Sequence, residues 1–322
     1  MNIRSLGVLG VLFILVGVIG YTTGTFIAGI NMILKSQSLH TLSTFIVWYS
    51  GSPLFVGLLL LAVQIFMIRP RRHRTANIEN PLEIKQLVVA VLTAYNDEES
   101  IGAAVEDFKK NKHIGKVIVI DNNSSDRTAT LARRAGAKVF VEEKPGYGQC
   151  VFRALTEGLK YRQYSHVLLC EGDMTFRAHD VEKFLAYAPH VDIVNGTRIL
   201  EQLRAKKTQL STFMYYGNFF VGKLLEIKHI GRGTFTDVGT TYKLCNSEAL
   251  RTLMPKLNSN INLEFNAYFL DAALQHDLSL LECPVTFHAR LGKSKGGNVN
   301  DRRALIVGLR MIRGLIFGWR MK

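Results

Sequence analysis

Two long stretches near the start of the chain carry no charged side chain. The first runs from Ser5 to Leu34 and the second from Phe45 to Ile68. A helix rises about 1.5 Å per residue, so roughly 20 apolar residues cross the ~30 Å hydrocarbon layer of a membrane. A cleaved signal peptide is the alternative for the first stretch, but this stretch is too long and a second one follows it. We therefore expect a two-helix transmembrane hairpin.

The basic residues around these stretches predict how the hairpin is oriented. The link expected at residues 35–44 carries one Lys and one His, whereas residues 69–74 carry four Arg. Because Arg and Lys favour the cytoplasmic side, we expect both the N-terminus and the rest of the chain in the cytoplasm. Gly20 and Gly24 are spaced as in a close-packing face of the first helix. We expect this face to contact the second helix, and a homo-oligomer contact is the less favoured alternative.

The chain has a formal net charge of +14, from 40 basic and 26 acidic residues. This charge is compatible with nucleic-acid binding, but the sequence shows no basic-aromatic RNA motif, zinc finger or basic helix-turn-helix pattern. A surface that faces anionic membrane lipids explains the charge equally well, and we expect no nucleic-acid partner. The cysteines lack zinc spacing and lie in apolar surroundings, so we expect reduced core residues. They are Cys150, Cys170, Cys245 and Cys283.

From Leu87 onward, short apolar runs alternate with amphipathic stretches, which predicts an α/β domain with a mostly parallel sheet. The expected strands are residues 87–92, 116–120, 138–141 and 166–170. The expected helices are residues 99–110, 126–135 and 148–161. We expect three parts, which are the hairpin with its basic flank (1–75), the α/β domain (76–298) and an amphipathic C-terminal helix (299–322).

Three of the expected strands are followed by acidic clusters. These are Thr-Ala-Tyr-Asn-Asp-Glu at 93–98, Asp-Asn-Asn-Ser-Ser-Asp at 121–126 and Glu-Gly-Asp at 171–173. In open α/β sheets, ligands bind beyond the carboxyl ends of the strands. Asp and Asn also cap helices, which is a structural explanation for the second cluster. Together, the three clusters predict a site for a metal and a polyhydroxy ligand.

In their order, spacing and placement, these segments resemble the family-2 glycosyltransferases of the GT-A fold. Within that family they are most similar to the dolichyl- and polyprenyl-phosphate mannose or glucose synthases, from about Leu87 to Lys295. Residues 93–98 are similar to Pro-x-Tyr-Asn-Glu-Glu, 121–128 to Asp-Asp-Gly-Ser-x-Asp-x-Thr, and 144–148 to a Gly-Lys-Gly segment. The resemblance implies a Rossmann-like GT-A domain that uses a UDP- or GDP-sugar as donor.

The resemblance also implies which residues bind this donor. Asp97 and Asp121 are placed near the base and ribose, and the turn at Gly146 brings the backbone close to the ligand. Residues 236–243 resemble the Asp-x-x-x-Gly-Tyr-Arg segment near the sugar, with Thr241 in place of Gly and Lys243 in place of Arg. The other donor-binding residues implied by the matching segments are Tyr95, Glu98, Asn122, Glu171, Asp237 and Ser294.

The central motif of the family, Asp-x-Asp, is Glu171-Gly-Asp173 in this chain. Both ends remain carboxylates, which suit hard ions such as Mg²⁺ or Mn²⁺. We expect Asp173 to bind the metal ahead of Glu171, whose longer side chain either reaches the ion differently or accepts a ribose hydroxyl. Thr175 stands where mannose-phosphate synthases often have Gln. His288 is a weaker metal candidate, and a structural histidine is at least as good an explanation.

The resemblance implies a catalytic set of Asp173, Arg198, Arg290 and Lys295. Residues 195–198 are similar to the segment whose Arg lies near the acceptor phosphate, and residues 290–295 match Arg-x-Gly-x-Ser-Lys, whose cations neutralise the leaving diphosphate. A lipid monophosphate is itself nucleophilic, so the acceptor needs cations more than a general base. One of Arg204, Lys206 or Lys207 is a second candidate cation, and a solvated basic face is the alternative.

Residues 305–319 carry an apolar stripe flanked by Arg. This amphipathic pattern predicts a helix that either lies at the membrane interface or packs on the α/β domain. We therefore expect a multi-pass membrane enzyme with a cytoplasmic catalytic domain, which transfers a sugar to a polyprenyl phosphate with inversion. The alternatives are transfer to diacylglycerol or another glycolipid hydroxyl, with Glu264 as base, and a non-enzymatic scaffold. Neither the sugar nor the length of the lipid is readable from the sequence.

Overall fold

The computed structural model describes residues 3–67, 88–199, 208, 210–292 and 300–319. The chain divides into two compact units. The first consists of Met1–His73, Ile227–Ile230 and Arg313–Gly318, and the second of Arg74–Glu226, Gly231–Ile312 and Trp319–Lys322. Both boundaries expected from the sequence, 75/76 and 298/299, lie outside the described residues, as does the basic segment 69–74.

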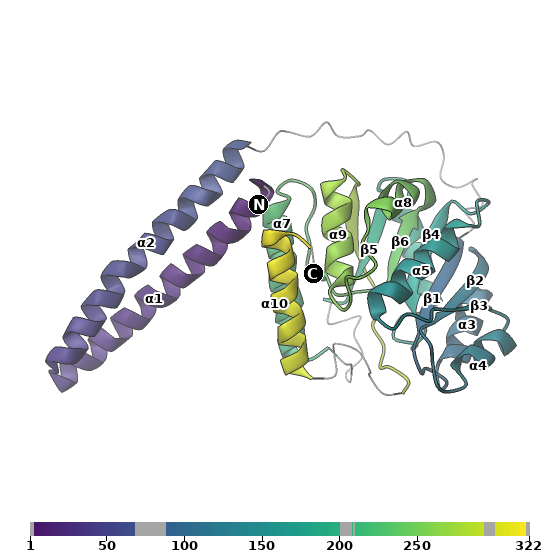
Figure 1. Cartoon of the computed structure of the whole chain (residues 1–322), viewed down its shortest axis with the longest axis horizontal. Helices are drawn as coiled ribbons and strands as arrows, with labels where there is room; N and C mark the ends of the chain where they lie inside the picture. Colours follow the sequence, from purple (N-terminus) through teal and green to yellow (C-terminus); the bar gives the residue numbers. More distant parts are fainter. Residues whose placement is uncertain (1–2, 68–87, 200–207, 209, 293–299, 320–322) are drawn as a thin grey trace. The chain divides into compact units, whose positions relative to one another are not determined.

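The first unit contains the helical hairpin formed by α1 (Leu6–Leu34) and α2 (Gln37–Met67) (Figure 1). The helix α1 ends at Lys35, whose backbone is left-handed with φ 49°. The link expected at residues 35–44 was therefore too long, because α2 already begins at Gln37. Residues 37–44 are mostly polar but contain neither Gly nor Pro, so nothing in them stops the helix from starting early.

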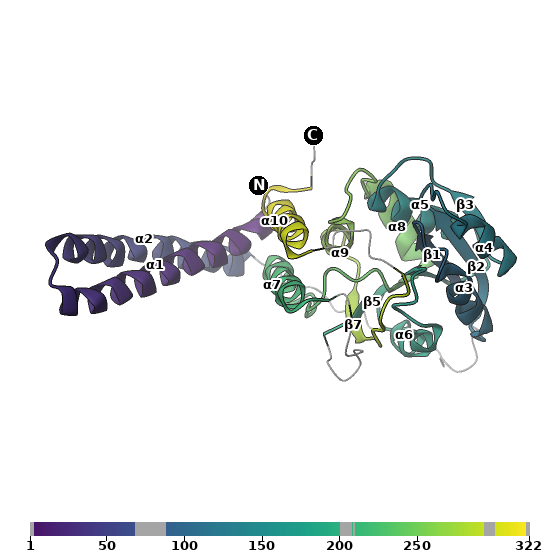
Figure 2. The same cartoon turned by 90° about the horizontal axis from the view of Figure 1, so that it is seen from below.

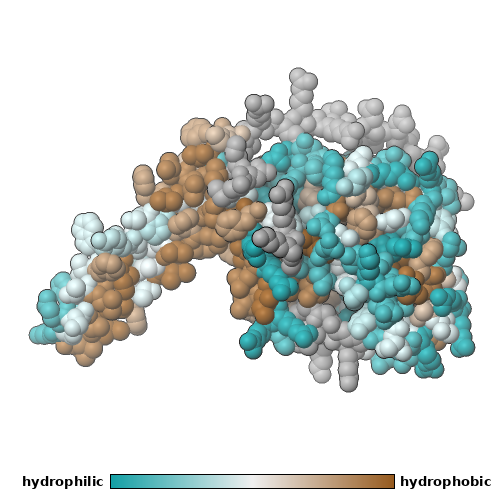
Figure 3. Space-filling view, in the orientation of Figure 1, coloured by the Kyte–Doolittle hydropathy of each residue, from teal (hydrophilic) through white to brown (hydrophobic). Residues whose placement is uncertain are grey.

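Small residues bring the two helices of the hairpin into close contact. A Cβ added at Gly24 would lie 2.8 Å from Val47 Cγ2, and one added at Gly20 would lie 3.2 Å from Ser50 Cβ. These contacts agree with the expected packing face. The outward surface is apolar over much of its length (Figure 3), with Phe66 89% exposed. By length and composition, both helices are able to cross a membrane.

The second unit is built on a seven-stranded sheet in the order β3-β2-β1-β4-β6-β5-β7. Within it, β6 runs antiparallel to β4 and β5, and the other pairs are parallel. The strands are β1 (Val88–Ala94), β2 (Ile114–Asp121), β3 (Lys138–Val141), β4 (His166–Glu171), β5 (Ile193–Thr197), β6 (Lys243–Asn246) and β7 (Leu280–Pro284). The four strands predicted from the sequence are all present, and β1, β2 and β4 extend beyond the expected ends.

Helices cover both faces of this sheet. Figure 2 shows α3 and α6 on one side and α5, α8 and α9 on the other. Residues of α3 and α6 form a core with β1 that includes Phe108, Phe184 and Leu92, all fully buried. The four cysteines are buried and unpaired, as expected. The helices that lie wholly in this unit are α3 (Ile101–Lys110), α4 (Thr128–Arg134), α5 (Tyr147–Leu159), α6 (Val181–Tyr187), α8 (Ser247–Leu253) and α9 (Phe265–Gln275). Most of α7 (Thr212–Lys228) and α10 (Asp301–Phe317) belongs to it as well, and only their last residues are assigned to the first unit.

Candidate functional site

The three acidic clusters meet at one edge of the sheet. Because β1 lies between β2 and β4, register places Ala94 beside Asp121 and Thr93 beside Glu171. The chain turns sharply just beyond each strand, since Asn96, Asn123 and Met174 all have positive φ. Such backbone is uncommon outside glycine and tends to gather at functional sites. The strand ends therefore form the natural place to look for a ligand.

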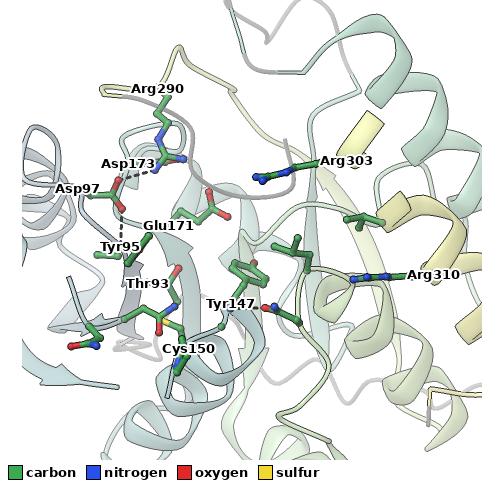
Figure 4. Close-up of a pocket in the computed structure, with 18 of the residues that line it drawn as sticks. Thr93, Tyr95, Asp97, Tyr147, Cys150, Glu171, Asp173, Arg290, Arg303 and Arg310 are labelled. Carbon is green, nitrogen blue, oxygen red and sulfur yellow. Dashed lines mark hydrogen bonds and ion pairs between the residues drawn. The ribbon is translucent and has the colours of Figure 1, made fainter. Parts of the chain in front are cut away.

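A cavity of about 570 Å³ opens at these strand ends. Figure 4 shows Tyr95 and Asp97 on one side of it, with Arg303 and Arg310 of α10 reaching in from the opposite side. Several residues predicted from the sequence line this cavity, namely Tyr95, Asp97, Asn122, Gly146, Glu171, Asp173 and Arg290.

Arg290 connects two of the acidic clusters. Its Nη2 lies 2.7 Å from Asp97 Oδ1, and its Nη1 lies 3.2 Å from Asp173 Oδ2. Asp173 Oδ1 in turn accepts hydrogen bonds from the backbone nitrogen (3.0 Å) and hydroxyl (2.6 Å) of Thr175. Thr175 thus orients the Asp173 carboxylate. The guanidinium of Arg290 provides the positive charge among these buried carboxylates.

Glu171 lies beside this group and is held from another direction. Its Oε1 accepts a 2.7 Å hydrogen bond from the hydroxyl of Thr241. That hydroxyl lies 2.5 Å from Tyr147 OH, which also accepts a 2.9 Å bond from Asn266. Burial, together with the neighbouring Asp173 carboxylate, raises the pKa of Glu171 to about 7. Burial likewise raises the pKa of Tyr147, so its phenol keeps its proton at neutral pH.

Arg198 is buried against Asp237 in a two-pronged ion pair. Its Nε and Nη2 each lie 2.7 Å from an oxygen of Asp237. Burial works to raise the pKa of Asp237, but the charge and hydrogen bonds of Arg198 outweigh it and lower that pKa overall. Lys243 is also buried, and burial lowers its pKa to about 7. Lys243 lines neither cavity described here, so its predicted contact with the donor is not part of this arrangement.

A second cavity, of about 390 Å³, adjoins the first and has a different character. Its walls come largely from α7 and α10, and its polar end is formed by Arg198, Asn218 and Asn266. The two cavities share five residues, which are Tyr147, Glu171, Leu263, Arg290 and Val307. We call this second cavity the apolar groove. Its apolar lining includes Phe213, Met214, Phe220, Val221, Leu263, Leu305, Val307, Leu309, Met311 and Ile312.

The family model described as glycosyl transferase family 2 matches residues 89–254, just over half of the chain. The chain is a family-2 glycosyltransferase. The glycosyltransferase AglJ of Haloferax volcanii is 31% identical over 163 residues, which cover 50% of this chain and 51% of that protein. A dolichyl-phosphate hexose transferase of the same organism is 24% identical over 65% of this chain and 86% of its own length. The chain spans about half the length of the first curated relatives that it matches.

The fold of this glycosyltransferase is GT-A, as the sequence predicted. A crystal structure of glucosyl-3-phosphoglycerate synthase from Mycobacterium tuberculosis, in complex with Mn²⁺, UDP-glucose and glycerol 3-phosphate, shares it with a TM-score of 0.51. The two sequences are 13% identical, and the alignment covers 79% of this chain and 88% of that structure.

Several predicted residues of the glycosyltransferase line neither cavity. Glu98 is paired with Arg127 at 3.1 Å, and Asp121 is buried beneath the loop that follows β2, with Oδ2 3.3 Å from Ser124 N. The ring of His288 stacks edge-on to His179, 6.1 Å away. The backbone nitrogen of His288 donates to the carbonyl oxygen of Thr175 at 2.9 Å, and its metal-binding role stays a prediction.

The remaining predicted residues lie outside the described part of the chain. These are Ser294 and Lys295 of the cationic loop, and the candidate acceptor cations Arg204, Lys206 and Lys207.

Sequence reasoning missed the residues that α10 and α5 bring to the site. Arg303 and Arg310 line the first cavity from α10, and their spacing of seven residues would have placed them on one helix face. Tyr147 stands between Gly146 and Gly148, and the sequence pattern there predicts only a turn. Glu264, the candidate base for a hydroxyl acceptor, is 1% exposed and lines neither cavity.

Proposed function

We propose that this glycosyltransferase moves a sugar from a UDP- or GDP-sugar onto a polyprenyl phosphate at the cytoplasmic face of a membrane, with inversion. The observation that carries the proposal is the apolar groove, which meets the polar cavity at Glu171 and Arg290. A polar donor and a long apolar acceptor need two such compartments that share the reacting centre. Walls of Phe, Leu and Ile would shield the apolar chain of such an acceptor from water.

The polar end of the apolar groove suits a phosphate group. Arg198 lies there with its charge held in place by Asp237, and its Nη1 makes no hydrogen bond to a described residue. Arg is well matched to phosphate because its planar fork donates several hydrogen bonds. We propose that Arg198 binds the acceptor phosphate, whose oxygen attacks the anomeric carbon while the bond to the donor diphosphate breaks.

The leaving diphosphate develops the largest negative charge of the reaction. We propose that Arg290 stabilises this charge, since it already lies among Asp97 and Asp173 in the donor cavity. Arg303 and Arg310 add positive charge to the facing wall. Lys295 keeps its predicted role in this step as part of the proposal.

The residues present also fit a divalent metal. Asp173 Oδ2 is buried and accepts no hydrogen bond in the described part of the chain, although Arg290 lies near it. Mg²⁺ or Mn²⁺ bound with substrate phosphates typically needs only one or two protein carboxylates. We propose that Asp173 holds the ion, with Glu171 as the second candidate. A bound ion would neutralise part of the diphosphate charge. The complex of the synthase with Mn²⁺ and UDP-glucose supports this proposal.

A membrane location would agree with a polyprenyl phosphate as the acceptor. The hairpin is apolar and long enough to span a bilayer, and a polyprenyl phosphate would reach the enzyme within that bilayer. The relative named as a dolichyl-phosphate hexose transferase supports this class of acceptor. Transfer to a lipid hydroxyl would need a base, and the candidate Glu264 is buried, lines neither cavity and lies with Oε1 3.7 Å from Arg310 Nη1.

The proposal is tested by supplying both classes of acceptor. Purified full-length protein is incubated in detergent with Mn²⁺ or Mg²⁺, radiolabelled UDP- and GDP-sugars, and either undecaprenyl phosphate or diacylglycerol. Radiolabel in a glycolipid from which mild acid releases the sugar would support a polyprenyl phosphate as the acceptor. Label only in an acid- and alkali-stable glycolipid would replace it with the hydroxyl reading. If the protein neither transfers sugar nor binds nucleotides, the non-enzymatic scaffold would be the remaining hypothesis.

A further inference from the structure

A directed chain of hydrogen bonds ends on the Glu171 carboxylate. Asn266 Nδ2 contacts both Tyr147 OH (2.9 Å) and the carbonyl oxygen of Gly239 (3.1 Å), so the amide nitrogen is the atom that faces Tyr147. Each hydroxyl has one hydrogen to donate. Since Thr241 gives its hydrogen to Glu171 Oε1, Tyr147 must give its own to Thr241. The order is therefore Asn266, Tyr147, Thr241 and Glu171.

Two departures from the family pattern meet in this chain of hydrogen bonds. Glu171 stands where the family has Asp, and Thr241 stands where it has Gly. In this protein the two side chains are 2.7 Å apart and bonded to each other. A glycine at 241 would offer no hydroxyl, and an unsupported Glu side chain has more rotatable bonds than Asp. In this chain the longer carboxylate of Glu171 is therefore held by the Thr241 hydroxyl.

The position of Glu171 indicates what this carboxylate faces. Glu171 lines both the donor cavity and the apolar groove. With a nucleotide diphosphate in the first and a lipid phosphate at the end of the second, the transferred sugar lies where they join. Oε1 is taken by Thr241, while Oε2 makes no hydrogen bond to any residue that the structure describes. A carboxyl oxygen that carries no proton accepts hydrogen bonds from hydroxyl groups such as those of a sugar.

Resting on the proposed function, we propose that Glu171 recognises a hydroxyl of the transferred sugar, and that Thr241, Tyr147 and Asn266 are the residues that position it. Thr241 and Asn266 are 2% and 5% exposed, so water does not compete for these bonds. Asp173 is then the carboxylate left for the metal. The arrangement makes residue 241 a determinant of how well the sugar, rather than the nucleotide, is bound.

The test compares binding of nucleotide sugars with binding of the bare nucleotides, by calorimetry on the full-length protein with Mn²⁺ and no acceptor. The ligands are UDP-glucose with UDP, and GDP-mannose with GDP. Thr241→Val keeps the shape of the side chain but removes the hydroxyl, Thr241→Ser restores it, and Tyr147→Phe breaks the preceding bond. Thr156→Val is the matched control, because Thr156 on α5 bonds only to the carbonyl of Phe152 at 2.8 Å.

Thr241→Val is expected to weaken the nucleotide sugar about tenfold or more, which is the scale of one hydrogen bond to a charged group, and to leave the bare nucleotide unchanged. Tyr147→Phe should change the same ratio in the same direction, and Thr241→Ser should return it to the wild-type value. Equal losses for sugar and nucleotide would reduce the network to a structural role, and no loss for either would overturn the inference. Failure of the wild type to bind either pair would overturn the proposed donor as well.

Discussion

Replacing glycines that line the apolar groove by a larger residue is the sharpest test of whether the lipid acceptor binds there. Gly217 on α7 and Gly308 on α10 both line the groove, and a Cβ at either position meets no atom within 4 Å. A side chain can therefore start at either position without a clash at its Cβ, and Leu would extend into space that the acceptor would use. Replacing Gly inside a helix also favours the fold by about 1 kcal/mol, so unfolding is not expected to confuse the result.

The expected loss of transfer can be estimated from the apolar surface of the lipid that the groove would bury. A prenyl chain that reaches the active site leaves the bilayer, and the groove then shields it from water. If Leu displaces one isoprenoid unit of about five carbons, at about 0.8 kcal/mol for each, the cost is about 4 kcal/mol. That corresponds to roughly a thousandfold lower kcat/KM for the lipid acceptor. The donor cavity is untouched, so binding of the nucleotide sugar should remain.

The assay measures sugar transfer to undecaprenyl phosphate and, in parallel, slow hydrolysis of the donor by water. Gly217→Leu and Gly308→Leu should lose transfer but keep hydrolysis. Gly102→Leu is the control, since Gly102 lies on α3 with equally open space around it. Transfer at the wild-type rate by both groove variants would refute the assignment of the groove to the lipid.

Three further predictions concern the metal, the sheet and the hairpin. Asp173→Asn should abolish transfer and weaken Mn²⁺ binding seen by electron paramagnetic resonance, and persistent activity would contradict the metal assignment. Burial lowers the pKa of His166 to about 4, below its usual 6.5. The unfolded chain therefore takes up the proton first, and acidification from pH 6.5 to 4 should cost about 3 kcal/mol of stability. His166→Gln should remove that loss from pH-dependent unfolding curves, whereas an unchanged curve would contradict it. Gly24→Ala places a Cβ 2.8 Å from Val47, so it should destabilise the hairpin by about 1–3 kcal/mol in thermal unfolding, and an unchanged melting temperature would argue against the tight contact.

Local patterns predicted the parts of the fold that depend on neighbouring residues. Apolar runs located β1, β2, β3 and β4, because buried parallel strands read as continuous hydrophobic segments. The acidic residues after β1 and β4 were found because strand ends converge in any such sheet. The start of α2 at Gln37 was missed because the polar residues before Phe45 lie outside the apolar run, although they contain no residue that would break a helix.

The rest of the site depends on contacts between distant segments. Tyr147, Thr241 and Asn266 are separated by 94 and 25 residues along the chain, yet they share hydrogen bonds. No pattern in the sequence joins them, because each is an ordinary polar residue in its own segment. Arg290 could be matched to a family motif, but its pairing with both Asp97 and Asp173 is a tertiary fact. The antiparallel β6 was likewise invisible, since pairing direction is set by the whole sheet.

The contact at Gly148 determines which walls of the active site act as one body. A Cβ there would lie 1.6 Å from the carbonyl oxygen of Ile261, so backbone meets backbone directly. One residue earlier, Tyr147 N donates to Asn262 Oδ1 at 2.7 Å. The first turn of α5 and the loop before α9 are therefore in direct contact, and we expect them to move together. A motion that admits a bulky donor, or lets the nucleotide leave, is therefore expected in the walls of the cavity other than these two segments.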